Sequence, residues 1–337
     1  MSKNSLERDV PFDQFNRQVQ VKSILDALRT KQKPYFKILD VGGYKGRTAD
    51  FLQSDNVTVL DIFDIKEEGY VRGTALNMPF EDGSFDFVVS YDVLEHIPAD
   101  EREKFVDECS RVSKSGFIIC APHNSEANVA AELSLNEYYR RLHRKPHPWL
   151  REHIENGLPD FNKVEKRAIT NGFLTSTLTS NRIQLWAAMQ QAIFLNSKYP
   201  MAAEKLTEVN EKYNTRASYD RGVPKGEAYR IILCCLKEAT DHKTIQNLIK
   251  TSQANPAGPS LEIELYEALA EYNRTILQKT ATLALQYKKL HAFEKKRAYT
   301  LQVENEELHR VILNHKSKHN PHPLMKISKS LLMRGRK

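Results

Sequence analysis

The sequence is poor in cysteine and contains no long apolar run. Its 337 residues include four cysteines, at positions 109, 120, 234 and 235, and none of them forms a CxxC pair. We therefore expect reduced, buried thiols and neither a disulfide framework nor a cysteine-based zinc site. No apolar stretch approaches the roughly 18 residues of a membrane-spanning helix, and the first ten residues lack the apolar segment of a signal peptide. These absences predict a cytoplasmic protein.

Acidic residues are absent from the end of the sequence. Residues 308–337 hold eight lysines and arginines and no aspartate or glutamate. Without these eight charges, the net charge of +7 becomes −1 for residues 1–307. A nucleic-acid enzyme more often carries positive charge on its folded body, so we expect no nucleic-acid partner. The last stretch, LMKISKSLLMRGRK, predicts a basic amphipathic tail over 320–337 that contacts a membrane surface peripherally.

Proline and glycine are missing between residues 261 and 313. Leucine or isoleucine recurs every seven residues at positions 269, 276, 283 and 290, and the period resumes at 301 and 308 after a stutter. This pattern predicts a long helix over 258–315 that self-associates as a coiled coil. A single helix docked on the main domain is the alternative.

Residues 1–250 alternate between strand-like and helical segments. We predict strands at 38–41, 57–61, 85–90, 116–122, 172–180 and 228–238, and helices at 11–30, 101–113 and 183–214. Such alternation predicts an α/β domain in which a mostly parallel sheet has helices on both faces.

A glycine-rich turn follows the first of these strands, in KILDVGGYKGRTADFL (residues 37–52). Its glycines are Gly42, Gly43 and Gly46. Glycine lets the backbone turn sharply and leaves no side chain between it and a ligand, and the N-terminus of the following helix can face that ligand. The second strand ends on Asp61, about 20 residues further on, which is the spacing of a nucleotide-binding βαβ unit.

Four segments, in order, resemble the class I S-adenosylmethionine-dependent methyltransferases: ILDVGGYKG, VTVLD, GTALNMPFEDGSFDFVVSYDVLEHI and GFIICAPH. The third is similar to the family pattern DA..LPF.DGSFD.V.S..VLEH. The resemblance is strong over residues 35–125. It implies a doubly wound, mostly parallel seven-stranded sheet of the Rossmann-like methyltransferase kind, with a helical insertion, and S-adenosyl-L-methionine as cofactor.

The resemblance also implies the contacts of the cofactor. Asp40 would hold the glycine turn or accept a bond from the cofactor amine, and Asp61 would accept bonds from the ribose hydroxyls. Ile62 would pack on the adenine, while Tyr91 and Asp92 would lie beside the transferred methyl. The implied cofactor-binding residues are Asp40, Gly42, Gly43, Gly46, Asp61, Ile62, Ala75, Leu76, Tyr91 and Asp92.

Two positions depart from the family pattern. Tyr44 stands where the family usually has glycine, and Thr74 stands where it usually has an acid that accepts a bond from the adenine amino group. A threonine hydroxyl accepts such a bond without charge, so we expect weaker cofactor binding. Both departures keep open an alternative: a non-catalytic methyltransferase fold that acts as a scaffold through its coiled coil.

The part of the site that binds the methyl acceptor is inferred from HPWLREHIENGLP, residues 147–159. This segment resembles methyltransferases encoded with bacterial surface-polysaccharide and glycosyltransferase genes. That resemblance implies O-methylation of a sugar in a surface glycan or glycan precursor, and contact with glycosyltransferase machinery at the inner membrane. A small metabolite, a lipid quinone or a protein remains an alternative acceptor.

Methyl transfer to a hydroxyl needs a base near the acceptor, because an alcohol is a poor nucleophile at neutral pH. The catalytic candidates are His96, Glu152 and His153, with His123 and His147 behind them. Their structural alternatives are a helix cap for His96, an ordinary loop position for His123, and loop anchoring for Glu152 and His153. The histidines at 143, 147 and 153 lack clustered aspartate or cysteine, so we expect no metal site.

Overall fold

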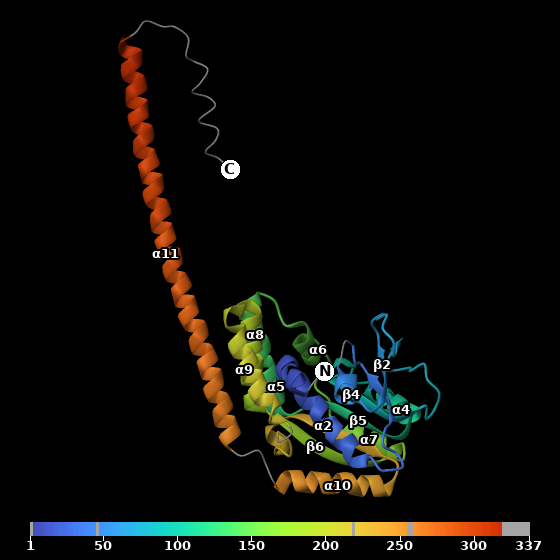
Figure 1. Ribbon diagram of the computed structural model, residues 1–337. Helices are drawn as coiled ribbons and strands as arrows, with labels where there is room; N and C mark the ends of the chain where they lie inside the picture. Colours follow the sequence, from blue (N-terminus) through green and yellow to red (C-terminus); the bar gives the residue numbers. More distant parts are fainter. Residues whose placement is uncertain (1–2, 45–46, 218–219, 255–258, 319–337) are drawn as a thin grey trace. The chain divides into compact units, whose positions relative to one another are not determined.

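The computed structural model describes residues 3–44, 47–217, 220–254 and 259–318 (Figure 1). Within them, seven strands form one sheet in the order β3-β2-β1-β4-β5-β7-β6. The strands are β1 (Lys37–Val41), β2 (Asn56–Asp61), β3 (Tyr70–Arg72), β4 (Phe85–Tyr91), β5 (Ser113–Pro122), β6 (Leu174–Arg182) and β7 (Ala228–Leu236). β1 to β5 pair in parallel, and β7 lies antiparallel between β5 and β6. The predicted mostly parallel, seven-stranded Rossmann-like methyltransferase fold is confirmed.

The described helices and 3-10 turns precede, connect and follow these strands. They are α1 (Lys3–Asp9), α2 (Phe12–Leu28), α3 (Thr48–Phe51), η1 (Leu94–His96), α4 (Arg102–Val112), α5 (Glu126–His143), α6 (Pro148–Asn156), α7 (Phe161–Thr170), α8 (Ile183–Lys198), η2 (Pro200–Ala202), α9 (Ala203–Asn214), η4 (Lys225–Glu227), α10 (Ala239–Ala254) and α11 (Pro259–Lys318). The predicted helix over 183–214 is therefore interrupted. Pro200 lacks a backbone N–H, so the α-helical hydrogen-bond ladder does not continue through it.

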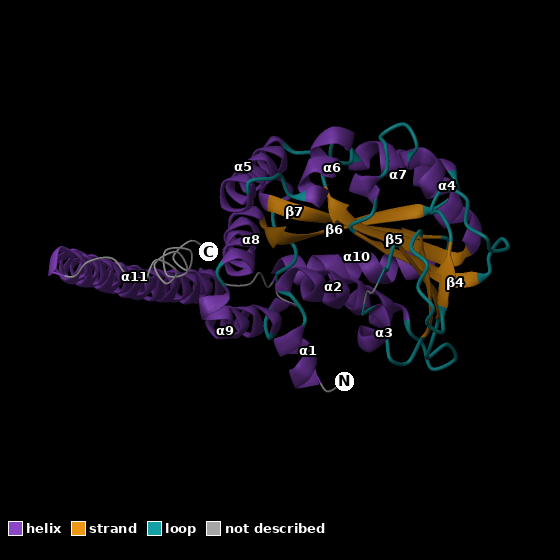
Figure 2. Ribbon diagram, turned by 90° about the horizontal axis from the view of Figure 1, so that it is seen from above, coloured by secondary structure: helices purple, strands orange, loops and turns teal. Residues whose placement is uncertain are grey.

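Helices cover both faces of the sheet (Figure 2). On one face, α4 and α7 pack their apolar residues, among them Phe105 and Val164, against the strands. On the other, α2 and α10 contribute residues such as Ile24 and Ile245. Because both faces are covered, β4, β5 and β7 are buried almost throughout, which explains their continuous apolar runs.

The strand order reverses at β1, which lies between β2 and β4. In open α/β sheets, ligands bind outside the carboxyl ends of the strands at such a switch point. Because β1, β2 and β4 are parallel neighbours, the glycine turn after β1, the acid that ends β2 and the loop after β4 all emerge there. The topology thus brings three separate sequence motifs to one edge of the sheet.

The chain divides into two compact units, residues 1–276 and 277–337. α11 is a continuous helix, as predicted, and its first part belongs to the first unit. Leu269 and Ile276, two members of the heptad pattern, are buried there together with Leu265 and Tyr272. From residue 277 onward, Leu283, Leu290 and Leu301 are each more than half exposed. The coiled coil stays a prediction for this second unit.

The four cysteines are buried and free, as expected for reduced core residues. No helix among the described residues has the length and apolar character needed to span a membrane. The predicted amphipathic tail, residues 320–337, lies outside the described residues.

Candidate functional site

The turn after β1 is shaped by two close contacts. Gly42 has φ +76°, a conformation that favours glycine, and a Cβ there would overlap the side chain of Val93 after β4. A Cβ on Gly43 would lie 2.5 Å from Oδ2 of Asp40 and 2.7 Å from Val59. Both positions therefore admit glycine alone without a shift. The contact with Val93 joins the turn directly to the segment that carries the candidate base His96.

Asp40 is fully buried beneath this turn. Its Oδ2 accepts a 2.6 Å hydrogen bond from the Thr48 hydroxyl, while its Oδ1 is buried without a partner. Burial raises the pKa of Asp40 to about 6, although the Thr48 bond and the charge of Arg17 act in the opposite direction. An unpaired buried oxygen is costly, so this position suits a donor group on a ligand.

Asp61 ends β2 beside the turn. Its Oδ2 accepts a bond from the Tyr44 backbone N–H at 2.8 Å, and its Oδ1 accepts one from the Phe63 N–H at 3.1 Å. Tyr44 has φ +39° and so adopts a glycine-like conformation where the family usually has glycine. The exposed side chains of Tyr44, Ile62 and Phe63 form an apolar surface beside the Asp61 carboxylate.

Ala75 and Leu76 pack, half-buried, against the core of the sheet. Their neighbour Thr74 already uses its hydroxyl, which accepts a 3.2 Å bond from the Leu76 N–H. Gly46, the third glycine of the turn, lies outside the described residues.

Tyr91, which we predicted to follow the strand, is the last residue of β4, and Asp92 comes directly after it. Asp92 forms an ion-pair network. The Asp92 carboxylate accepts bonds from Arg17 and from Arg230, whose Nε lies 2.8 Å away. Burial alone would raise the pKa of Asp92, but the two guanidinium groups outweigh it and hold the pKa below its usual value. Asp13 in turn pairs with Arg230 at 2.7 Å. We did not predict this network, although an arginine inside the apolar strand AYRIILCCL is a visible signal.

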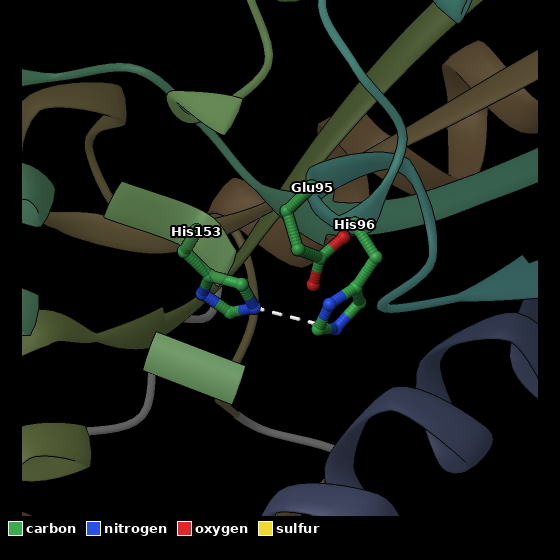
Figure 3. Close-up of side chains that lie close together, drawn as sticks. All are labelled: Glu95, His96 and His153. Carbon is green, nitrogen blue, oxygen red and sulfur yellow. Dashed lines mark hydrogen bonds between the residues drawn. The ribbon is translucent and has the colours of Figure 1, made fainter. Parts of the chain in front are cut away.

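The predicted catalytic residues His96, Glu152 and His153 come together although they lie on different elements. The His96 Nδ1–H donates to Oε2 of Glu152 at 2.8 Å, and the His153 Nδ1–H donates to Glu132 at 3.1 Å. The two Nε2 atoms face each other at 3.3 Å. Figure 3 shows the carboxylate of Glu95 beside these two rings. Glu95 and Glu132 were not predicted, because both read as ordinary helix residues in the sequence.

This acid–histidine cluster, defined as Glu95, His96, Glu132, Glu152 and His153, is held by hydrogen bonds between η1 and α6. Arg102 donates to the Leu94 carbonyl on one side and to the Asn156 carbonyl on the other. Asn156 donates from its side chain to the His96 carbonyl at 3.0 Å. The backbone segments that carry His96 and His153 are therefore fixed to each other.

The charges of the cluster are unevenly distributed. Burial raises the pKa of Glu95 to about 8, and the negative charge of Asp92 adds to this effect. Burial lowers the pKa of His96, and the neighbouring His153 lowers it further. Burial alone would lower the pKa of His153, but the bond to Glu132 and the charge of Glu95 raise it. In the absence of a ligand, His153 is thus the histidine that holds a proton more tightly.

The other candidate histidines have structural contacts. His123 is buried and bonds the Ala228 carbonyl at 3.0 Å. His147 is the N-cap of α6, where its ring accepts a bond from the Leu150 N–H, and it stacks on Phe194. His143 stacks on Tyr139. The histidines at 143, 147 and 153 do not form a metal-capable group among the described residues.

Comparison with known proteins places this geometry in a family. Residues 39–120 match a family model described as a methyltransferase domain. This region is a class I S-adenosylmethionine-dependent methyltransferase domain. Ajmaline N-methyltransferase and norajmaline N-methyltransferase, both from Rauvolfia serpentina, are 40% and 43% identical over 74 and 68 residues, or 22% and 19% of this chain. The match spans about a quarter of the length of these relatives, 25% and 23% respectively.

Solved structures with a similar arrangement include the YcgJ protein from Bacillus subtilis, with a TM-score of 0.38 and 16% identity over 66% of this chain and 99% of that one. Another is phosphoethanolamine N-methyltransferase 2 from Haemonchus contortus in complex with S-adenosylhomocysteine, with a TM-score of 0.39 and 17% identity over 65% of this chain and 52% of that one.

The residues around the glycine turn fit S-adenosylmethionine, the cofactor of this family. The unpaired Oδ1 of Asp40 offers an acceptor for the cofactor amine, and the glycine turn leaves room for the backbone to approach a ligand. Asp61 offers carboxylate lone pairs for ribose hydroxyls, beside the exposed apolar side chain of Ile62. When bound, this cofactor supplies an electrophilic methyl group.

Proposed function

We propose that this chain is a methyltransferase whose acceptor is a hydroxyl oxygen of a sugar in a surface glycan or glycan precursor. The observation that carries the proposal is the acid–histidine cluster with its His96–Glu152 bond. Val93, in the same segment as His96, lies against Gly42 of the glycine turn and so links the turn to the cluster. Segment 147–159, which resembles methyltransferases encoded with surface-polysaccharide genes, contributes Glu152 and His153 to this cluster. The sequence resemblance and the cluster therefore both favour this region as the acceptor site.

The cluster provides the base that a hydroxyl acceptor requires. Glu152 orients the His96 ring through Nδ1, so Nε2 carries a lone pair that can accept a proton. Nε2 of His96 would accept the proton of the acceptor hydroxyl, and the bound cofactor would supply the methyl group and leave as S-adenosylhomocysteine. The lowered pKa of His96 keeps this ring neutral at neutral pH. Because its Nε2 faces Nε2 of His153 at 3.3 Å, the acceptor hydroxyl would have to displace that contact to reach it.

A nitrogen acceptor is the second candidate, favoured by the names of the two Rauvolfia relatives. An amine needs less assistance from a base than an alcohol does, so the two acceptor classes differ in their dependence on His96. A small metabolite, a lipid quinone or a protein would be tested in the same assay. A scaffold without activity would bind no cofactor.

The test is transfer of labelled methyl from S-adenosylmethionine to a panel of lipid-linked sugars, free sugars, small-molecule amines, quinols and proteins. Calorimetry with S-adenosylhomocysteine runs in parallel. We expect micromolar cofactor binding, about −8 kcal/mol, and labelling of the sugar hydroxyl. Labelling of amines alone would replace the sugar by a nitrogen acceptor, and absence of cofactor binding would leave the scaffold.

A further inference from the structure

The two facing imidazoles pose an electrostatic problem. His96 and His153 each donate from Nδ1 to a carboxylate, so their neutral tautomers carry lone pairs on Nε2. These two lone pairs face each other across 3.3 Å. Such an arrangement is stable only with positive charge between the rings, which means either a shared proton or a metal ion.

Glu95 distinguishes the two solutions. Its side chain is fully buried, and both carboxylate oxygens lack a hydrogen-bond partner in the structure. A proton shared between the histidines satisfies the rings but leaves the Glu95 carboxyl group, whether ionised or protonated, without a hydrogen-bond partner at a cost. A cation bound by both rings and the carboxylate satisfies all three groups. We propose that Glu95, His96 and His153 form a binding site for a divalent transition-metal ion of the zinc type.

The distances fit such an ion. With metal–nitrogen bonds of about 2.05 Å, a 3.3 Å separation of the two Nε2 atoms gives an N–metal–N angle of about 107°, close to tetrahedral. The ligand atoms of all three residues lie within 4.8 Å of one another. Two ligands of one ion are at most about 4.2 Å apart. The Glu95 oxygen therefore has to move toward the rings to join the ion, and no hydrogen bond holds it in place.

The surroundings match those of known metal histidines. A metal-bound histidine usually donates its other N–H to a carboxylate, which fixes its tautomer and orientation. Glu152 does this for His96, and Glu132 does it for His153, while the Tyr229 hydroxyl donates to Glu132 at 2.7 Å. The side chains of His96 and Glu152 remain 28% and 45% exposed, which gives an ion a path to the site.

Three protein ligands leave a fourth tetrahedral position open, as in catalytic zinc sites. If the proposed function holds, an acceptor hydroxyl occupies that position and gains acidity from the cation. In the metal-loaded protein, Nε2 of His96 is then a ligand and no longer a base. The cation would lower the pKa of the bound hydroxyl, and the proton would pass to solvent at the exposed side of the site. Metal binding itself does not depend on the proposed function, because it is measured without cofactor or acceptor.

The test is a titration of the chelator-treated full-length protein with Co²⁺, followed by its visible absorption, and with Zn²⁺ by equilibrium dialysis. We expect one ion per chain and the intense absorption of tetrahedral cobalt. E95Q should weaken binding at least 10-fold, and E152Q by 10- to 100-fold. E155Q, an exposed change on the same helix as Glu152 and His153, should leave it unchanged.

E95Q removes no hydrogen bond, so it should fold normally, and a thermal melt without metal checks this. Absence of stoichiometric uptake by the unaltered protein overturns the proposal and leaves a proton between the rings. Equal uptake by the unaltered protein and E95Q overturns it as well. Metal binding without methyl transfer would contradict only the proposed function.

Discussion

His96 and His153 lie 57 residues apart in the sequence, yet their Nε2 atoms face each other at 3.3 Å. The contact depends on two separate elements, η1 after β4 and the helix α6, which Arg102 joins through their carbonyl groups. Two separate parts of the chain, η1 and α6, therefore supply the side chains next to the glycine turn. The candidate base His96 and its hydrogen-bonded support Glu152 therefore lie in the segments next to the turn that we propose to hold the cofactor.

Glu152→Gln tests whether Glu152 orients and stabilises the candidate base His96. The amide no longer holds the charge that orients and stabilises the His96 ring, so we expect turnover to fall about 10²-fold. Cofactor affinity should stay unchanged, because the hydrogen bond of Glu152 goes to His96 and not to a described residue of the glycine turn. Glu155→Gln, on the same helix, is the matched control. Equal turnover in the two variants would assign Glu152 a structural role.

Gly43→Ala tests the glycine turn. The added methyl would lie 2.5 Å from the Asp40 carboxylate and 2.7 Å from Val59, so the turn must shift at a cost of about 1–3 kcal/mol. We expect lower stability in urea and weaker binding of S-adenosylhomocysteine. Gly226→Ala is the control, because a Cβ there meets nothing within 4 Å. If both variants bind S-adenosylhomocysteine with similar affinity, the turn is not part of the cofactor site.

The pKa of Asp40, about 6 in the free protein, predicts a pH dependence of cofactor binding. A cationic amine favours the ionised carboxylate, so binding lowers this pKa and is accompanied by proton release at low pH. Affinity should therefore rise up to tenfold per pH unit below about 6 and level off above it. Arg17 and Asp61 act on the same carboxylate in opposite directions. Calorimetry from pH 5 to about 8 measures the effect, which Asp40→Asn should abolish.

Much of the fold could be predicted, because the sheet strands are buried on both faces and form continuous apolar runs. β4 and β5 were predicted within a few residues for this reason. β3 was not predicted, because it has three residues, sits at the sheet edge and is half-exposed. The glycine turn was found from its glycines and Asp61 from its spacing, since each lies at the carboxyl end of one of two adjacent parallel strands, and their roles came from the family resemblance.

The candidate site could be predicted only in part. His96, Glu152 and His153 were selected for their chemistry, and the structure brings them together. Their partners Glu132 and Glu95 carry no local signal, because the pairing depends on how α5, α6 and η1 pack. The same is true of Arg17 and Arg230, which hold the Asp92 carboxylate. Sequence periodicity describes single elements, whereas these contacts join three or more.

The basic tail predicts reversible membrane contact. Each lysine or arginine near an anionic surface contributes on the order of 1 kcal/mol, and burial of its leucines adds to this. The full chain should therefore co-sediment with anionic liposomes at low salt and lose binding as salt rises. A chain that ends at Asn320 should stay in solution. Equal sedimentation of both chains, or of neither, would contradict membrane contact through the tail.

Self-association through α11 is the remaining prediction, and the structure decides where the helix can be cut. Leu265, Leu269, Tyr272 and Ile276 belong to the core of the first unit. A chain that ends before residue 265 would expose that core and aggregate, and this aggregation would say nothing about self-association through α11. A chain that ends at Lys279 keeps these residues and removes the exposed stripe, so we expect it to be monomeric.

Two point variants give a sharper test of the same helix. Leu283 and Leu285 are almost equally exposed, at 53% and 55%, but two residues along a helix turn them about 200° apart. Only Leu283 continues the heptad period, so a second copy of the chain should cover it. Leu283→Lys should dissociate the oligomer in sedimentation velocity, whereas Leu285→Lys should leave it intact. A monomeric unaltered chain, or equal effects of both substitutions, would rule out the heptad stripe as the interface.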